Sequence, residues 1–254
     1  MFGFLRRRRR RRLRDTPLPE ALRAIIDRNV RAAARLTAEE RRQLEGHVQV
    51  LLHEKRFEGC AGLEITDEIR ITIAAQAALL LLNRDPRYYP TLRTILVYPS
   101  AYVVRGERRM PDGTVAAGPQ VRLGESWQRG SVVLSWSDAR RGGMNHQDGR
   151  NVVLHEFAHQ LDGEDGLMDG TPALDSRAAG ATWAHVMQPE FDRLRQDIER
   201  DHPNLIRDYG ATNPAEFFAV VTETFFERPD ALRREHPALY EQLATYFRLD
   251  LAAR

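Results

Sequence analysis

Residues 151–162 read Asn-Val-Val-Leu-His-Glu-Phe-Ala-His-Gln-Leu-Asp and contain the pattern H-E-x-x-H. Residues four apart on an α-helix lie one turn apart on the same face, so His155 and His159 can bind one metal ion. Glu156, which follows the first histidine, can act as a general base toward a water molecule at that metal. The remaining residues are mostly apolar, and a buried helix holds such polar side chains only when they have partners. The segment therefore predicts a buried metal-binding helix.

This helix does not supply a complete catalytic zinc site, because such a site usually has three protein ligands and a water. The zinc peptidases with the pattern H-E-x-x-H-x-x-G-x-x-H are excluded, since positions 162 and 165 are both Asp. The third ligand is then expected to be a glutamate on a later helix. Asp162 is favoured as a neighbour of a ligand or as a cap rather than as a ligand.

A later helix, predicted to begin at Asn213-Pro214, offers three candidate glutamates. Asn is a good helix cap and Pro a good first helical residue. We favour Glu216, which lies in the first turn among apolar residues and needs a partner there. Glu223 shares part of that face and is the second choice, and Glu227 is the third candidate.

The charges divide the sequence into a basic N-terminus and an acidic remainder. The 254 residues carry a net charge of +2, and an unbroken run of arginines, residues 6–12, is followed by Arg14. Removing these eight charges leaves −6 on the rest of the chain. A block of like charges repels itself, so residues 1–14 are expected to form a disordered, solvated tail. No aromatic residues are interleaved with the arginines, which argues against direct nucleic-acid binding.

The composition also excludes several classes of protein. No apolar run approaches the roughly 20 residues that a membrane span needs. The polar residues Asp15 and Thr16 and then Pro17 follow the arginines, where a secretory signal would have its apolar stretch. Cys60 is the only cysteine, which excludes an internal disulfide and a cysteine-built zinc finger. A cytoplasmic location is favoured.

The order of the predicted elements indicates an α+β fold, mostly helical with a small antiparallel-rich sheet. Residues 15–254 are expected to form a single domain, with helices over 18–90, the sheet over 94–136 and the metal-site helices over 150–247. Four strands are predicted, with a turn at Pro111-Asp112-Gly113. They are residues 94–98, 101–105, 120–123 and 131–136.

Two long motifs together resemble one known family. They are residues 155–162 and residues 209–219, Tyr-Gly-Ala-Thr-Asn-Pro-Ala-Glu-Phe-Phe-Ala. With Tyr98-Pro99-Ser100 and Trp136-Ser137, they resemble the Mlc titration factor A family of zinc-dependent peptidases, from about Leu18 onward. The two long motifs are also similar to the catalytic domain of anthrax lethal factor, a gluzincin. The resemblance implies a zincin-like metallopeptidase fold.

The resemblance also implies roles for five residues. His155, His159 and Glu216 would bind one Zn²⁺ per chain. Glu156 would be the general base, and Tyr209 would stabilise the transition state. By the same resemblance the chain would hydrolyse peptide bonds, with aminopeptidase-like action on short substrates.

A non-catalytic regulatory protein with a structural zinc is the alternative. The namesake activity of the family is binding Mlc, a transcriptional repressor of sugar uptake, so an Mlc-like repressor is a candidate partner. An intact Glu156 and Tyr209 favour retained catalysis, because a structural zinc needs neither. By analogy with zincins, the strand over 132–135 is expected to pair with extended substrate.

Overall fold

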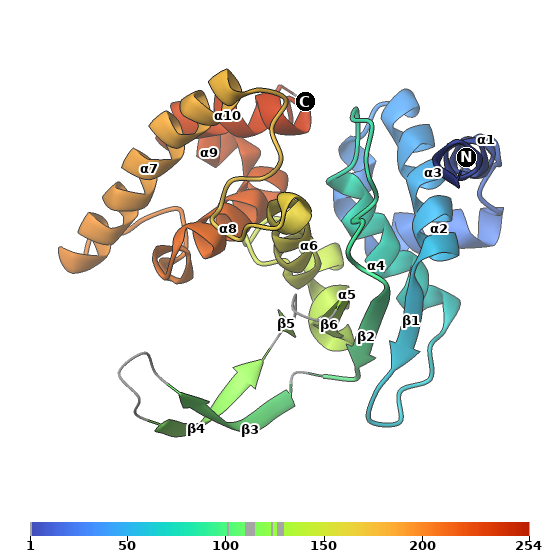
Figure 1. The fold of residues 1–254 in the computed structure, drawn as a ribbon, viewed down its shortest axis with the longest axis horizontal. Helices are drawn as coiled ribbons and strands as arrows, with labels where there is room; N and C mark the ends of the chain where they lie inside the picture. The colour runs from blue at the N-terminus through green and yellow to red at the C-terminus, as the bar shows by residue number, and fades with distance from the viewer. Residues whose placement is uncertain (1, 101, 110–114, 123, 126–129, 254) are drawn as a thin grey trace.

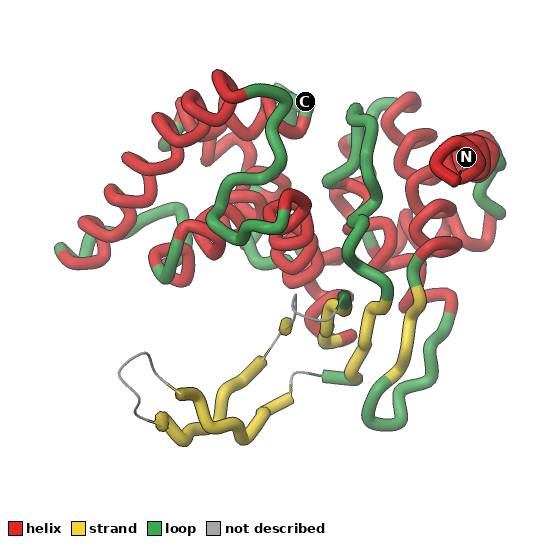
Figure 2. Tube along the Cα trace, viewed as in Figure 1, coloured by secondary structure: helices red, strands yellow, loops and turns green. Residues whose placement is uncertain are grey.

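The computed structural model describes residues 2–100, 102–109, 115–122, 124–125 and 130–253. In the view of Figures 1 and 2 the N-terminal helices lie at the right and the C-terminal helices at the upper left, with α5 (Trp136–Met144) and α6 (Val152–Asp162) between them and the small sheet below. The helices, with 3-10 helices marked η, are α1 (Phe2–Asp15), α2 (Glu20–Asn29), η1 (Arg31–Arg35), α3 (Ala38–Glu54), α4 (Asp67–Leu79), α5 (Trp136–Met144), α6 (Val152–Asp162), η2 (Gly163–Asp165), α7 (Arg177–Glu199), η3 (Asp208–Ala211), α8 (Pro214–Glu227), α9 (Pro229–Glu235) and α10 (Pro237–Phe247). The strands are β1 (Arg56–Gly59), β2 (Thr94–Tyr98), β3 (Tyr102–Arg109), β4 (Val115–Arg122), β5 (Gly124–Glu125) and β6 (Ser131–Ser135).

The main sheet is largely parallel, so the prediction of an antiparallel-rich sheet is wrong. Its strand order is β1-β2-β6-β5, with β1, β2 and β6 parallel and only β5 antiparallel to its neighbour. Parallel strands require a long crossover connection. Helix α4 lies within the connection from β1 to β2, and the antiparallel hairpin β3-β4 lies within the connection from β2 to β6. The central pair of the sheet, β2 and β6, is therefore formed by strands that are separated by three others in the sequence.

The individual strands follow the predictions more closely than their pairing does. β2 has the predicted bounds, whereas β6 ends at Ser135 because Trp136 begins α5. The hairpin strands β3 and β4 extend beyond the predicted ones, and residues 101, 111–113 and 123 lie outside the described part of the chain. β1 was not predicted, since its sequence Arg-Phe-Glu-Gly lacks an apolar run and its pairing to β2 holds it in place.

Helices α3 and α4 form much of the N-terminal core. The capping box at the start of α3 is present, since Thr37 accepts from the backbone of Glu40 and Glu40 reaches back to Thr37. Thr66 caps α4, and nearly every residue of α4 from Ile69 to Leu79 is buried. Helix α4 is therefore a central helix of the core. Within the described residues, none of the helices combines the length and apolar character that crossing a membrane requires.

The arginine run lies in helix α1, where the sequence favours a disordered tail over 1–14. This helix is stabilised by a carboxylate from a distant part of the sequence, and the local run of charges does not show that pairing. Glu54, at the end of α3, pairs with Arg6 and Arg10 at 2.8 Å each. The Arg10 guanidinium also lies 4.6 Å from the ring centroid of Tyr88. These contacts offset the repulsion between arginines and dock α1 on α3. The assignment of residues 15–254 to a single domain stays a prediction.

Candidate metal centre

Helix α6 carries the H-E-x-x-H pattern through the middle of the molecule. Its N-cap Asn151 accepts hydrogen bonds from the backbone of Val153 and Leu154, at 3.1 and 3.0 Å. His155, Glu156 and His159 are all buried, although the helix sequence around them is apolar. The helix therefore holds three polar side chains inside the protein, where they need partners.

Helix α8 supplies the partner for these histidines. Asn213 caps it by accepting from the backbone of Glu216 at 3.0 Å, and Pro214 is its first residue, as predicted. Every residue of α8 after Pro214 is buried. Glu216 lies in the first turn of α8 and its carboxylate points at α6.

His155, His159 and Glu216 come together at one point. Oε2 of Glu216 lies 3.0 Å from Nε2 of His155 and 3.3 Å from Nε2 of His159. One ligand atom from each residue lies within 4.8 Å of the others. Two imidazole nitrogens and one carboxylate oxygen are the ligand set of many catalytic zinc sites. The three residues thus fit a metal ion, and this is the candidate metal site of the described residues.

The charges at this point favour a bound cation. Burial lowers the pKa of His155, but hydrogen bonds to Glu216 and Glu223 outweigh it and raise the pKa to about 10. Burial raises the pKa of Glu216, but the two histidines reverse this and hold the pKa well below its usual range. The carboxylates thus draw positive charge to the imidazoles, and a metal ion that binds here would displace protons.

Glu223 is not one of the three clustered residues, although it was the second choice for the third ligand. Its Oε1 lies 2.8 Å from Nδ1 of His155, on the far side of the ring from Glu216. Its Oε2 accepts from the backbone N–H of Asn151 at 2.5 Å, and Arg207 forms an ion pair with it. Arg207 also donates to the carbonyl of Gly149 at 3.1 Å. Glu223 therefore fixes the orientation of His155.

The role of Glu223 has a signal in the sequence that our prediction did not use fully. Glu223 follows Glu216 by seven residues, which is two helical turns, so both carboxylates face α6. Glu223, the more C-terminal of the two, contacts Nδ1 of His155, whereas Glu216 faces Nε2 of the same ring. Arg207 has no comparable signal, because it comes from the loop before η3.

The remaining acidic candidates lie outside the cluster. Oε2 of Glu227 accepts from the backbone N–H of Arg150 at 2.9 Å, and burial raises the pKa of Glu227 to about 8. Oδ2 of Asp162 accepts from the backbone N–H of Gly170 at 3.0 Å. Asp162 thus holds the loop after the metal helix, which agrees with the expectation that it is not a ligand.

Glu156 and Tyr209 are both neighbours of His155, Glu156 as the next residue of α6 and Tyr209 through its ring. Glu156 is 6% exposed, and burial raises its pKa, while the charges of His155 and His159 act in the opposite direction. Tyr209, in η3, is 52% exposed, and its ring centroid lies 5.8 Å from that of His155. Burial and Glu216 raise the pKa of Tyr209 to about 12, so its hydroxyl keeps its proton at neutral pH.

The strand expected to pair with substrate already has neighbours on both sides. β2 pairs with β6 along its whole length, and Gly124 and Glu125 of β5 pair with Leu134 and Val133. Residues 133–134 are therefore not at the edge of the sheet, and the analogy with zincins does not carry over to them.

The chain is similar to known proteins over most of its length. A family model described as "Glucose-regulated metallo-peptidase M90" matches residues 4–248. An uncharacterized protein of Synechocystis sp. is 43% identical over 244 residues, which are 95% of this chain and 88% of that protein. Proteins named Mlc titration factor A, from Yersinia pestis and Yersinia pseudotuberculosis, are 31% identical over 229 residues, 89% of this chain and 84% of theirs. The family match includes the whole arginine run, which the motifs alone leave outside.

Proposed function

The chain belongs to the glucose-regulated metallo-peptidase family M90, and from this premise we propose that it is a zinc-dependent peptidase. The observation that carries the proposal is the convergence of His155, His159 and Glu216 within 4.8 Å, with Glu156 buried beside them. This set of side chains has the ligands, the base and the burial that metal-assisted hydrolysis requires.

The chemistry divides between a metal ion and the side chains. The two histidines and Glu216 would hold a zinc ion, which would supply Lewis-acid chemistry toward a water and the scissile carbonyl. Glu156 takes a proton from the attacking water and delivers it to the leaving amine. Its burial suits this role, because a raised pKa brings a carboxylate closer to the working pH of a base.

Tyr209 is the proposed donor to the oxyanion. Its hydroxyl is protonated at neutral pH and its ring lies against His155, so it can donate toward charge that develops on the carbonyl oxygen. Tyr209 is half-exposed, so a substrate can approach it from solvent. By family resemblance we propose aminopeptidase-like action on short peptides, in the cytoplasm.

A second function is favoured by the name of the Yersinia relatives. Proteins called Mlc titration factor A are named for an interaction with Mlc, and this chain is 31% identical to them. Binding of an Mlc-like transcriptional repressor is therefore a candidate regulatory function. It is compatible with peptidase activity, and it becomes the main function if the zinc is only structural.

The test compares the wild-type chain with Glu156→Gln, both loaded with zinc, on a mixed library of amino-acid anilides and short peptides. We expect the variant to keep its zinc and to lose turnover. Glu241→Gln, at an exposed position of α10, is the matched control and should cleave like wild type. Equal cleavage by wild type and Glu156→Gln would overturn the mechanism. A lack of cleavage by any zinc-loaded protein would favour the regulatory function.

A further inference from the structure

Helix α1 has an inner face that is fixed to the protein and an outer face that is not. Arg6, Arg10 and Leu13 recur at helical spacing on the inner face. The two arginines pair with Glu54, and Leu13 packs against the hydrophobic core. Close to Leu13, a Cβ atom at Gly46 of α3 would lie 2.9 Å from the carbonyl oxygen of Arg14, so the glycine permits the close approach of the two helices. The orientation of α1 is therefore fixed by several contacts along its length.

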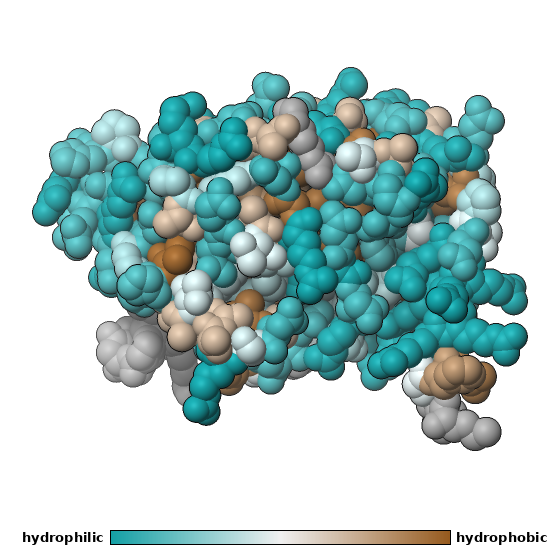
Figure 3. All heavy atoms as spheres, turned by 90° about the horizontal axis from the view of Figure 1, so that it is seen from above, coloured by the Kyte–Doolittle hydropathy of each residue, from teal (hydrophilic) through white to brown (hydrophobic). Residues whose placement is uncertain are grey.

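This docking turns a second set of side chains outward, which we call the outer face. They are Phe4, Leu5, Arg7, Arg8, Arg11 and Arg12. Phe4 is 72% and Leu5 58% exposed, and the four arginines are exposed as well. No carboxylate in the described part of the chain forms an ion pair with these four arginines. In Figure 3 the region of α1, at the right, is strongly hydrophilic and ends in a small hydrophobic group.

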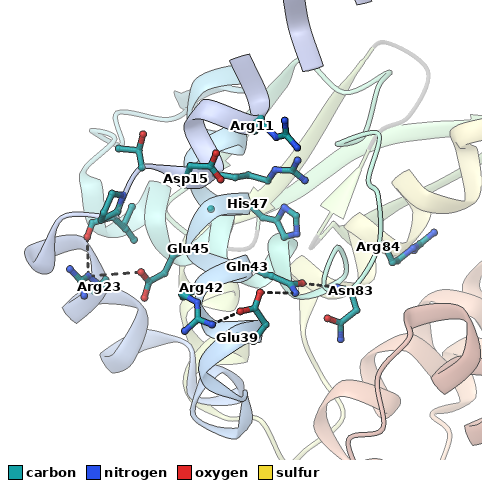
Figure 4. A pocket seen from close by; sticks show the side chains of 15 residues that line it. Arg11, Asp15, Arg23, Glu39, Arg42, Gln43, Glu45, His47, Asn83 and Arg84 are labelled. Carbon is teal, nitrogen blue, oxygen red and sulfur yellow. Dashed lines mark hydrogen bonds and ion pairs between the residues drawn. The ribbon is translucent and has the colours of Figure 1, made fainter. Parts of the chain in front are cut away.

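The outer face adjoins a cavity beside α1 that is also rich in arginine and that Arg11 helps to line (Figure 4). That cavity has a volume of about 880 Å³ and lies against α1 and α3. Its Arg23 lies 3.9 Å from Glu45, and its Arg42 pairs with Glu39, so these charges are compensated. Of the α1 arginines without an ion pair to a described carboxylate, Arg14 and Arg11 line this cavity, and Arg7, Arg8 and Arg12 lie on the outer face away from it.

We propose that the outer face of α1 is a docking surface for an anionic phospholipid membrane. Guanidinium groups bind phosphate through paired N–H donors, and basic side chains are attracted to a negatively charged leaflet. Phe4 and Leu5, at the N-terminal end of the same face, would enter the boundary between headgroups and acyl chains. This is the pattern of a helix that lies in the membrane surface and does not cross it.

Two features favour a membrane over a nucleic acid. A nucleic acid would use the four arginines but would leave Phe4 and Leu5 exposed to water. The part of the chain without the arginine run and Arg14 has a net charge of −6, so an anionic surface would repel the body and attract only α1. Docking through α1 would therefore hold the protein in one orientation.

The test uses the full-length chain in a sedimentation assay with two kinds of vesicle. One kind is phosphatidylcholine alone, and the other contains one-third phosphatidylserine. We expect binding only to the anionic vesicles, with weakening as salt rises. Replacing Arg7, Arg8, Arg11 and Arg12 together with Gln should reduce that binding by about a hundredfold or more, since each basic residue near the surface contributes measurably. Phe4→Ser with Leu5→Ser should reduce it while all the arginines remain.

A matched control separates a specific face from net charge alone. It replaces four exposed arginines outside α1, which are Arg140, Arg177, Arg195 and Arg200, with Gln. We expect this variant to bind vesicles like wild type. Equal loss in both quadruple variants would overturn the proposal, as would tight binding to duplex DNA with none to vesicles. Thermal unfolding of each variant checks that the fold is kept. We expect it to be kept, because Arg6 and Arg10, which pair with Glu54, are unchanged.

Discussion

Nδ1 of His155 lies 2.8 Å from Oε1 of Glu223, while Nε2 of the same ring faces Glu216. The buried carboxylate of Glu223 thus sets which nitrogen of His155 is directed at the metal centre. Arg207 and the backbone of Asn151 hold Glu223 in turn. Partners of this kind fix the tautomer of a ligating histidine and raise its basicity.

Glu223→Gln should weaken zinc binding by about tenfold to a hundredfold, because the amide keeps the shape but loses the charge that faces His155. Competition with a zinc-binding dye measures the affinity directly, without any substrate. Glu227→Gln is the matched control, since Glu227 lies one turn further along α8 and bonds to Arg150 instead. Unchanged zinc affinity in Glu223→Gln would show that the contact is only structural.

Removing the metal should lower the free energy of unfolding. A ligand that binds only the folded state stabilises it by about 2.7 kcal/mol when present at a hundred times its dissociation constant. The cluster of His155, His159 and Glu216 exists only in the folded chain, so zinc should raise the melting temperature and a chelator should lower it. The dependence on zinc should disappear in His159→Ala, and a zinc effect of full size in that variant would place the metal elsewhere.

Tyr209→Phe should reduce kcat by about tenfold to a thousandfold while the zinc content stays the same, because only a donor to the oxyanion is lost. The ring remains against His155, so KM should change little. Steady-state kinetics on whichever short substrate the wild type cleaves would measure both constants. A full kcat in Tyr209→Phe would mean that Tyr209 only lines the site.

The sequence was sufficient to predict helix α6 and the burial of its polar side chains, because the pattern is local. Two histidines four residues apart share a face in any helix, and an apolar helix that buries them needs partners for them. The helix of Glu216 was also recognisable from its cap and its proline. Glu216 lies at the cluster and Glu223 orients His155. Which glutamate takes which position depends on how α6 and α8 pack, and a single sequence does not specify that packing.

The parts that the sequence did not predict depend on distant contacts. The parallel direction of β2 and β6 follows from the connection between them, and each strand alone has the same pattern in either direction. Helix α1 was expected to be disordered, because the repulsion between arginines is visible in the sequence. Its compensation by Glu54 comes from a residue more than forty positions away.

His47 of α3 is a buried histidine outside the candidate metal centre. His47 is 3% exposed, and its Nδ1 lies 2.7 Å from the hydroxyl oxygen of Tyr88. Burial, followed by the charge of Arg14, lowers the pKa of His47 from 6.5 to about 4. Between these two pH values the unfolded chain binds the proton and the folded chain does not, so the free energy of unfolding falls as the pH falls.

The difference in pKa corresponds to a loss of about 3 kcal/mol between pH 6.5 and 4. Urea unfolding at several pH values across this window would measure it in the wild type and in His47→Gln. We expect the variant to be less stable near neutral pH but to lose less stability on acidification, because Gln does not titrate. His53→Gln, at an exposed position of the same helix, should keep the slope of the wild type. Parallel curves for the wild type and His47→Gln would mean that other groups cause the acid sensitivity, since the folded state would then not exclude the proton at His47.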